Sequence, residues 1–297
     1  MMARVVGETR PLVTDVLLTP TELGGELRIR PTDVAVVIDV IRATTTLAVL
    51  FDRGCARVLV AGDIPAARTF AAGHPGAYLL AGEVGGLRPP GFDFGNSPVE
   101  LAAADLSGRE VIFCTTNGTR ALHACAGAGA ILAGSLRNAQ AVCQTALRHI
   151  SAMPSSQPMP PPAPIDEPQP GEAASEARVE PEEQARRLLF VCSGRLGRPA
   201  VDDSLCAGVL LEHLERLARA AGSALMLRDG ARLACQVAAG TPAPIDLLRA
   251  SAAGQAVAKV GLEHDLAFCA EVAASQSVAQ VVGTNAAGFL VMERATL

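Results

Sequence analysis

The 297-residue chain has no tryptophan, one tyrosine and only 3% aromatic residues. Stacked aromatic rings are the usual platform for single-stranded nucleic acid, so a site of that kind is not expected. Lysine is nearly absent too, because Lys259 is the only one. The net charge is −5 and there is no run of basic residues. Nucleic acids and membrane surfaces are therefore not expected as partners.

Patterns typical of metal centres and disulfide frameworks are also missing. The eight cysteines include no CxxC pair, and the five histidines are isolated. This pattern disfavours a zinc site and is typical of reduced thiols in the cytosol. No amino-terminal stretch has signal-peptide form, and no apolar run is long enough to span a membrane. We therefore expect a cytoplasmic protein, with its oligomeric state, a homo-oligomer included, left open.

Short apolar runs alternate with helical stretches along most of the chain. The strand-like runs are 34–38, 58–61, 78–81, 111–114, 130–133 and 188–191. The helical stretches are 47–51, 65–72, 121–126, 138–150 and 204–220. This alternation predicts an α/β fold with a largely parallel sheet, in which ligands bind at the carboxyl ends of the strands.

Residues 151–187 differ from the rest of the chain. They are rich in proline and acidic residues and have no aromatic residue and no sustained apolar periodicity. Such a segment cannot bury enough apolar surface to offset its ordering entropy. We therefore predict a flexible insert between the N-terminal half (1–150) and the C-terminal half (188–297) of one catalytic unit. A partner-docking segment is the less favoured alternative.

Polar residues follow the first strand-like run where a helix should begin. Asp39 ends the run, Arg42 follows, and the hydroxyls of Thr44, Thr45 and Thr46 open the helix. Helix N-termini present unpaired N–H groups and a positive dipole end, which favour anions. The alternative is that a threonine only caps the helix and Asp39 only closes a turn.

Three further loops have a similar character. One reads TTNGTR (115–120), and another reads CSGRLGR (192–198) and is followed by Asp202 and Asp203. A third places Glu83 among glycines, and the nearby Asn96-Ser97-Pro98 is interpreted only as a helix start. Plain turns and helix caps are the alternative for each of them.

Together these loops contain the groups that a phosphate-ester hydrolase needs. Mg²⁺ prefers a few carboxylates with phosphate oxygens and water, and arginine binds such oxygens through a planar fork. Catalysis of phosphoryl transfer comes mostly from charge neutralisation and positioning. Neither GxxxxGK[ST] nor GxGxxG is present, so binding of ATP or NAD is not predicted. The DxD of the aspartate-nucleophile phosphatases is absent too, because Ile41 occupies its second acidic position.

The chain resembles the 2-phosphosulfolactate phosphatase family. The matching blocks, in family order, are VVIDVIRATTTLA, AGEVGGLRPPGFDFGNSPVE, TTNGTRAL, CSGRLGRPAVDDSLCAG and GLEHDLAFCAE. The resemblance implies a three-layer α/β/α fold with a mixed, largely parallel sheet. It also implies a Mg²⁺-dependent hydrolase that removes phosphate from 2-phospho-3-sulfolactate, a step of coenzyme M biosynthesis, or from a similar small 2-phospho acid.

The same resemblance nominates the site residues. For catalytic acid or base and metal roles they are Asp39, Glu83 and Asp203, with Mg²⁺ as the cofactor. For contacts with the anionic substrate they are Arg42, Thr45, Asn117, Thr119 and Ser193, and the loops themselves add Arg120, Arg195 and Arg198 as candidates. Which carboxylate binds metal, and which acts as acid, base or nucleophile, stays open.

Two other functions also stay open. Cys192 and Arg198 have the C-x5-R spacing of cysteine phosphatases, in which a thiolate of low pKa attacks phosphorus without a metal. The second alternative is a non-enzymatic anion-binding protein that uses the same loops. Activity that survives EDTA but not thiol alkylation would favour the first, and an absence of phosphate release would favour the second.

Overall fold

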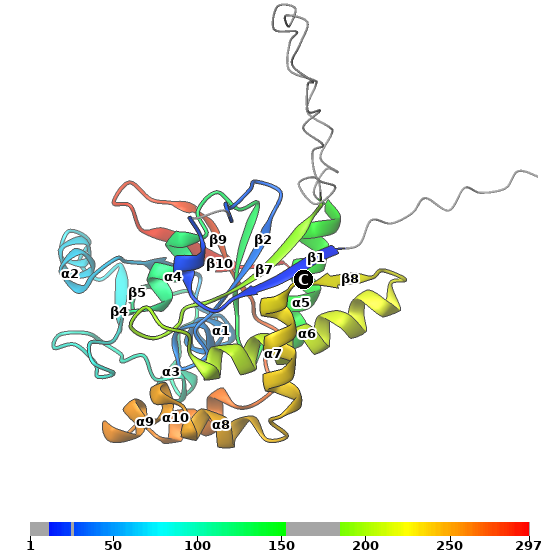
Figure 1. Ribbon diagram of the computed structural model, residues 1–297. Coiled ribbons are helices and arrows are strands. Elements are labelled where there is room, and N and C mark those ends of the chain that lie inside the picture. Colours follow the sequence, from blue (N-terminus) through cyan, green and yellow to red (C-terminus); the bar gives the residue numbers. More distant parts are fainter. Residues whose placement is uncertain (1–11, 25–26, 153–184, 297) are drawn as a thin grey trace, which may run out of the picture.

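The computed structural model describes residues 12–24, 27–152 and 185–296. Within this part of the chain, ten strands form one sheet in the order β4-β5-β3-β10-β9-β6-β2-β7-β1-β8 (Figure 1). The strands are β1 (Leu12–Leu17), β2 (Val34–Ile38), β3 (Arg57–Val60), β4 (Tyr78–Gly82), β5 (Glu110–Cys114), β6 (Ala130–Gly134), β7 (Arg187–Cys192), β8 (Leu225–Leu227), β9 (Ala279–Thr284) and β10 (Leu290–Arg294).

The sheet consists of two parallel blocks. One contains β6, β2, β7, β1 and β8, and the other contains β3, β5 and β4. The C-terminal strands β9 and β10 join the blocks through antiparallel pairs. The predicted three-layer α/β/α fold with a mixed, largely parallel sheet is confirmed.

Helices cover both faces of this sheet (Figure 1). They are α1 (Ala43–Asp52), α2 (Ile64–Ala72), α3 (Pro98–Ala102), α4 (Gly118–Ala124), α5 (Ala139–Ala152), α6 (Val201–Ala220), α7 (Asp229–Ala239), α8 (Pro244–Ala250), α9 (Ala252–Lys259) and α10 (His264–Cys269). A short 3-10 turn, η1 (Pro20–Glu22), follows β1.

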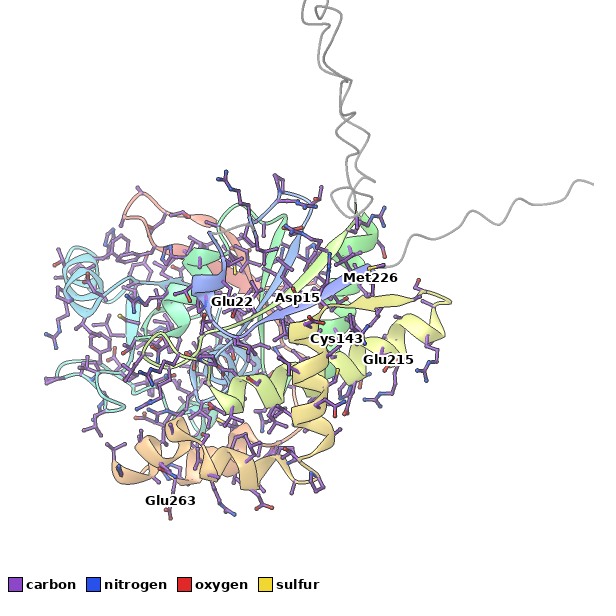
Figure 2. The ribbon with its side chains drawn as sticks, in the orientation of Figure 1. Asp15, Glu22, Cys143, Glu215, Met226 and Glu263 are labelled. Carbon is purple, nitrogen blue, oxygen red and sulfur yellow. The ribbon has the colours of Figure 1, made fainter. Side chains whose placement is uncertain are left out.

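The central strands are apolar at nearly every position because both of their faces are covered. Successive side chains alternate between the faces. Val36 and Phe190 pack in a cluster with α5, α6 and α7, whereas Val37 packs in a second cluster with α1 and α4. The thiol of Cys143 on α5 donates a hydrogen bond of 3.2 Å to the carbonyl oxygen of Leu210 on α6 (Figure 2).

The second cluster also joins the two blocks of the sheet. Val60 of β3 and Phe113 of β5 belong to it, together with Leu50 of α1 and Val37 of β2. Both blocks therefore contribute to one apolar cluster with α1. The loops that follow β4 and β5 line one cavity together with those that follow β2 and β7.

The two halves of the chain share this sheet, because β7 pairs with β2 and with β1. Ser151 and Ala152 complete α5, and Arg187 begins β7, so the predicted insert is shorter than 151–187. Its remaining part, residues 153–184, lies outside the described residues. In the described part of the chain, no helix is both long and apolar enough to cross a membrane.

Candidate functional site

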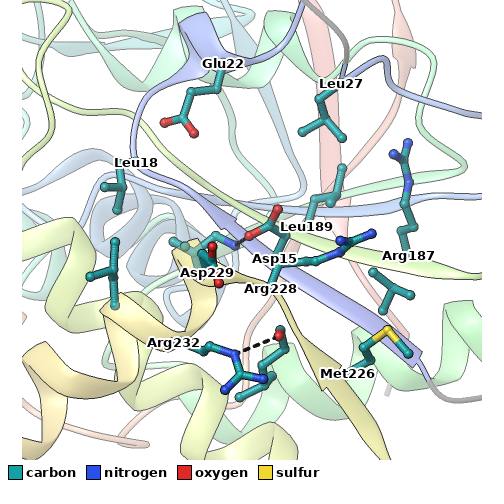
Figure 3. A pocket seen from close by; sticks show the side chains of 15 residues that line it. Asp15, Leu18, Glu22, Leu27, Arg187, Leu189, Met226, Arg228, Asp229 and Arg232 are labelled. Atoms are coloured by element: carbon teal, nitrogen blue, oxygen red, sulfur yellow. Dashed lines mark hydrogen bonds between the residues drawn. The ribbon is translucent and has the colours of Figure 1, made fainter. Parts of the chain in front are cut away.

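A cavity of about 780 Å³ lies beside β1 and β8 (Figure 3). Two of its charged side chains hydrogen-bond to nearby backbone: Asp15 accepts the N–H of Val16 at 2.8 Å, and Arg232 donates to the carbonyl of Leu227 at 3.2 Å. None of the site residues nominated from the sequence lines this cavity. The candidate site therefore lies elsewhere.

A second cavity, of about 240 Å³, opens where the loops after β2, β4, β5 and β7 meet. Among the eleven residues nominated from the sequence, five line it: Asp39, Arg42, Glu83, Asn117 and Arg195. Helix α9 contributes an apolar wall of Ala253, Ala256 and Val257. Helix α9 therefore closes one side of this cavity, and it packs against α8, which in turn contacts α10, at one end of the molecule (Figure 1).

Asp39 lies at the end of β2 with 7% of its surface exposed. Its backbone is fixed by Thr44, whose hydroxyl accepts the Asp39 N–H at 3.1 Å, and Oδ1 accepts the N–H of Ala43 at 3.4 Å. Burial, reinforced by the nearby carboxylates of Asp202 and Glu83, raises the pKa of Asp39 to about 6. A bound cation would favour the ionised form instead.

Glu83 joins the loop after β4 to the loop after β5. Its Oε1 accepts both the N–H and the hydroxyl of Thr116, at 3.0 and 2.7 Å, and its Oε2 accepts the N–H of Gly86 at 2.8 Å. The turn that presents this N–H has φ of 61° at Gly85 and 86° at Gly86. Glycine adopts such angles without steric cost, which explains the Gly-Gly pair after Glu83.

Arg42 lines the cavity but is also held by the protein. Its Nη1 donates to Oδ2 of Asp265 at 2.8 Å, and its Nη2 donates to the carbonyl of Gly86 at 2.8 Å. Asp265 is fully buried and also accepts the hydroxyl of Ser97 at 2.6 Å. Sequence reasoning missed Asp265, because an acid in the first turn of a helix is explained by the helix dipole alone.

Asp203 lies behind the cavity wall rather than on it. Its Oδ1 accepts the N–H of Val40 at 3.0 Å, and its Oδ2 accepts the hydroxyl of Ser193 and the N–H of Gly194 at 3.0 and 3.1 Å. Burial beside Asp202 raises the pKa of Asp203, and these hydrogen bonds oppose that shift. Asp203 and Ser193 thus connect the loops that follow β2 and β7.

The other four nominated residues do not line the cavity either. Thr45 is buried, and its hydroxyl donates to the carbonyl of Val40 at 2.9 Å. Thr119 is buried, and its hydroxyl has no hydrogen-bond partner. Arg120 and Arg198 are exposed.

The structure argues against a cysteine phosphatase. Cys192 has no exposed surface and belongs to the apolar cluster beneath α6. Burial raises the pKa of its thiol well above the ordinary value, which disfavours the thiolate that attacks phosphorus. Arg198, the second member of the C-x5-R pattern, is exposed and does not line the cavity.

Two cavity residues, Asn96 and Thr115, were not nominated from the sequence. Both are 5% exposed, and neither Oδ1 of Asn96 nor Oγ1 of Thr115 has a hydrogen-bond partner. The interpretation of this segment as a helix start is confirmed, because the hydroxyl of Ser97 accepts the N–H of Glu100 and caps α3. Because the helix start accounts for this segment, Asn96 was not nominated from the sequence.

The cavity suits a hard cation, although no three His, Cys, Asp or Glu side chains in the described part of the chain form a group that could hold a metal. Mg²⁺ usually needs only one or two carboxylates, because substrate and water supply its other oxygens. Asp39 and Glu83 line the cavity together with the unpartnered oxygens of Asn96 and Thr115. This all-oxygen set fits Mg²⁺ without Asp203.

The fold and this cavity define an α/β protein whose acidic and basic side chains converge at strand ends, a site suited to a small anionic ester. The chain belongs to the 2-phosphosulpholactate phosphatase family, a family of phosphoric monoester hydrolases, whose pattern matches residues 18–152 and 173–284. The resemblance seen in the sequence is thereby confirmed, and the match omits 20 residues (153–172) of the predicted insert.

Three relatives, each described as a probable 2-phosphosulfolactate phosphatase, illustrate the similarity. One from Thermus thermophilus is 37% identical over 247 residues, which cover 83% of this chain and 86% of the relative. One from Deinococcus radiodurans is 36% identical, with 84% and 88% covered. One from Gloeobacter violaceus is 31% identical, with 87% and 91% covered.

Proposed function

We propose that the chain is a Mg²⁺-dependent phosphatase that converts 2-phospho-3-sulfolactate, or a similar small 2-phospho acid, to the 2-hydroxy acid and phosphate. The observation that carries this proposal is the convergence of Asp39, Glu83, Arg42 and Arg195 on one cavity at the strand ends. The printed descriptions of the relatives support the choice of substrate. The proposal includes a cytoplasmic location and a place in coenzyme M biosynthesis.

In this proposal the residues on different walls of the cavity bind the cation, bind the substrate and exclude water. Asp39 and Glu83 hold Mg²⁺, which supplies positive charge to neutralise the phosphoryl oxygens. Arg195, which is partly exposed on the cavity wall, binds the anionic groups of the substrate. The apolar side chains of α9 reduce the water around these charges, which strengthens their attraction.

The charges of the cavity explain why a cation is part of the proposal. Two carboxylates line the cavity, and Arg42, one of its two arginines, is already paired with Asp265. A trianionic substrate would therefore meet little net positive charge from these side chains alone. Burying anions without compensation costs free energy, so the divalent cation is needed for binding as well as for reaction.

Phosphate release from a panel of esters tests the proposal. The panel contains 2-phosphosulfolactate, 2-phospholactate, 2-phosphoglycerate and p-nitrophenyl phosphate, each with Mg²⁺ and with EDTA. We expect turnover with Mg²⁺, fastest on 2-phosphosulfolactate, and at least about a 10²-fold loss in Asp39→Asn. Full activity in EDTA, or near-normal turnover by a folded Asp39→Asn protein, would contradict it.

A further inference from the structure

Two oxygen atoms in the candidate site are buried without a partner. They are Oδ1 of Asn96 and Oγ1 of Thr115, and both residues line the same cavity as Asp39 and Glu83. An unpaired buried polar atom costs free energy, and such atoms are rare in folded proteins. Their presence on a cavity wall points to a ligand that pairs with them.

Thr115 Oγ1 and Oδ2 of Asp39 lie on the same side of Gly118. A Cβ added to this glycine would lie 3.4 Å from Thr115 Oγ1 and 3.1 Å from Asp39 Oδ2. The two oxygens, which belong to the loops after β5 and β2, therefore border the same small space beside Gly118.

The backbone around Asn96 is fixed even though its amide oxygen is unpaired. Its carbonyl oxygen accepts the hydroxyl of Thr46 at 3.4 Å, and the hydroxyl of the next residue, Ser97, donates to Asp265 at 2.6 Å. Ser97 also caps α3. The unpaired amide oxygen is thus a feature of a well-held segment.

The chemistry of the proposed substrate decides what kind of partner these oxygens have. Phosphate, carboxylate and sulfonate groups offer acceptors and, when fully ionised, no donors. Asn96 Oδ1 can only accept and therefore cannot pair with such a substrate, whereas the hydroxyl of Thr115 can also donate to it. A hard cation takes amide, hydroxyl and carboxylate oxygens together.

We propose that Asn96 Oδ1 and Thr115 Oγ1 complete, with Asp39 and Glu83, the oxygen set that holds the divalent cation. This inference rests on the proposed function, because the cation is the Mg²⁺ of that proposal. It replaces Asp203, which does not line the cavity, by two neutral ligands on the cavity wall.

The test measures cation binding directly, without turnover. Mn²⁺ serves as the probe, and its affinity for the substrate-free protein is followed by electron paramagnetic resonance. We expect Asn96→Leu and Thr115→Val each to weaken Mn²⁺ binding by about tenfold or more, and Asn96→Asp to retain it, since aspartate keeps an oxygen in place. Ser277→Ala is the control: Ser277 has a buried, unpartnered hydroxyl outside the cavity, and its removal leaves the affinity unchanged.

Circular dichroism confirms that each variant is folded, and Thr115→Val carries the test if Asn96→Leu fails to fold. Unchanged Mn²⁺ affinity in both Asn96→Leu and Thr115→Val overturns the inference and leaves the proposed phosphatase intact. Equal losses in Asn96→Asp and Asn96→Leu also overturn it, because the amide NH₂ would then be the important group. A wild-type protein that hydrolyses the ester but binds no Mn²⁺ or Mg²⁺ removes the inference together with the metal part of the proposed function.

Discussion

Arg42 and Asp265 form an ion pair of 2.8 Å whose side chains are 2% and 0% exposed. The pair joins the loop after β2 to α10, near the C-terminal end of the chain. Because Arg42 also donates to Gly86 and Asp265 also accepts from Ser97, the pair links three walls of the cavity. It connects the helices α8–α10 to the loops that carry the candidate ligands.

Breaking this pair should therefore strongly destabilise the protein. Asp265→Ala leaves the buried guanidinium of Arg42 without its carboxylate, and removing one partner of a buried pair costs about 3–5 kcal/mol. The free energy of unfolding, measured in urea, checks this. The control is Glu215→Gln in the exposed pair with Arg219, where about 0.5 kcal/mol is expected. A similarly small loss in Asp265→Ala would show that the pair does not hold the walls together.

Gly118→Ala should damage the site although it lies in a helix, where alanine is normally the better residue. The added Cβ would sit 2.9 Å from the Cβ of Ala43 and 3.1 Å from Oδ2 of Asp39, so Asp39 must move. We expect at least a tenfold loss of kcat/KM, because small misplacements of reacting groups are costly. Gly62→Ala, which meets nothing within 4 Å, is the control. If both variants have wild-type activity, the position of Asp39 is less critical than we infer.

Much of the fold could be predicted from the sequence, because buried central strands are apolar at nearly every position. The run Val34–Ile38 is apolar throughout and was predicted at the bounds that β2 has. β8 (Leu225–Leu227) was missed, since a strand of three residues at a sheet edge is defined by its partner rather than by its own pattern. The hairpin of β9 and β10, which joins the two parallel blocks, was also missed.

The candidate site could be predicted only in part, because a local sequence pattern reveals some of its residues and not others. Asp39 and Glu83 were found because acids at strand ends, beside glycines or threonines, exceed what a turn needs. Asn96 and Asp265 were missed, because a helix start explains each of them locally. Their place at the site depends on the packing of segments that are far apart in the sequence, and no local pattern encodes that packing.

Thiol reagents should leave the activity nearly unchanged. Burial raises the pKa of Cys192 well above its usual range, and that of Cys114, the cysteine at the end of β5, to about 11. Thiolates, the reactive species, are then scarce at neutral pH. Native protein treated with iodoacetamide at pH 7.5 should retain its phosphate release, and Cys192→Ala should turn over within a few-fold of wild type. Inactivation by iodoacetamide that substrate prevents, together with an inactive but folded Cys192→Ala, would restore the cysteine mechanism.

Arg195, and not Arg120, should bind the anionic groups that the substrate carries besides its phosphate. Both arginines were nominated from the sequence, but only Arg195 lines the cavity, whereas Arg120 is exposed outside it. 2-Phosphosulfolactate carries a carboxylate and a sulfonate besides its phosphate, and p-nitrophenyl phosphate carries neither. Arg195→Met should therefore reduce kcat/KM for the trianionic substrate more than for the simple ester. The expected difference is about 1.5–3 kcal/mol, or roughly 10- to 150-fold, for a charge-assisted contact.

Arg120→Met is the matched control and should reduce both activities little and in equal proportion. The comparison separates a specific contact from a general loss of positive charge, because each variant removes one positive charge at the same end of the sheet. Equal proportional losses in Arg195→Met on both substrates would mean that this guanidinium contacts the phosphoryl group or none. The carboxylate and sulfonate would then have to be bound by other groups on the cavity wall.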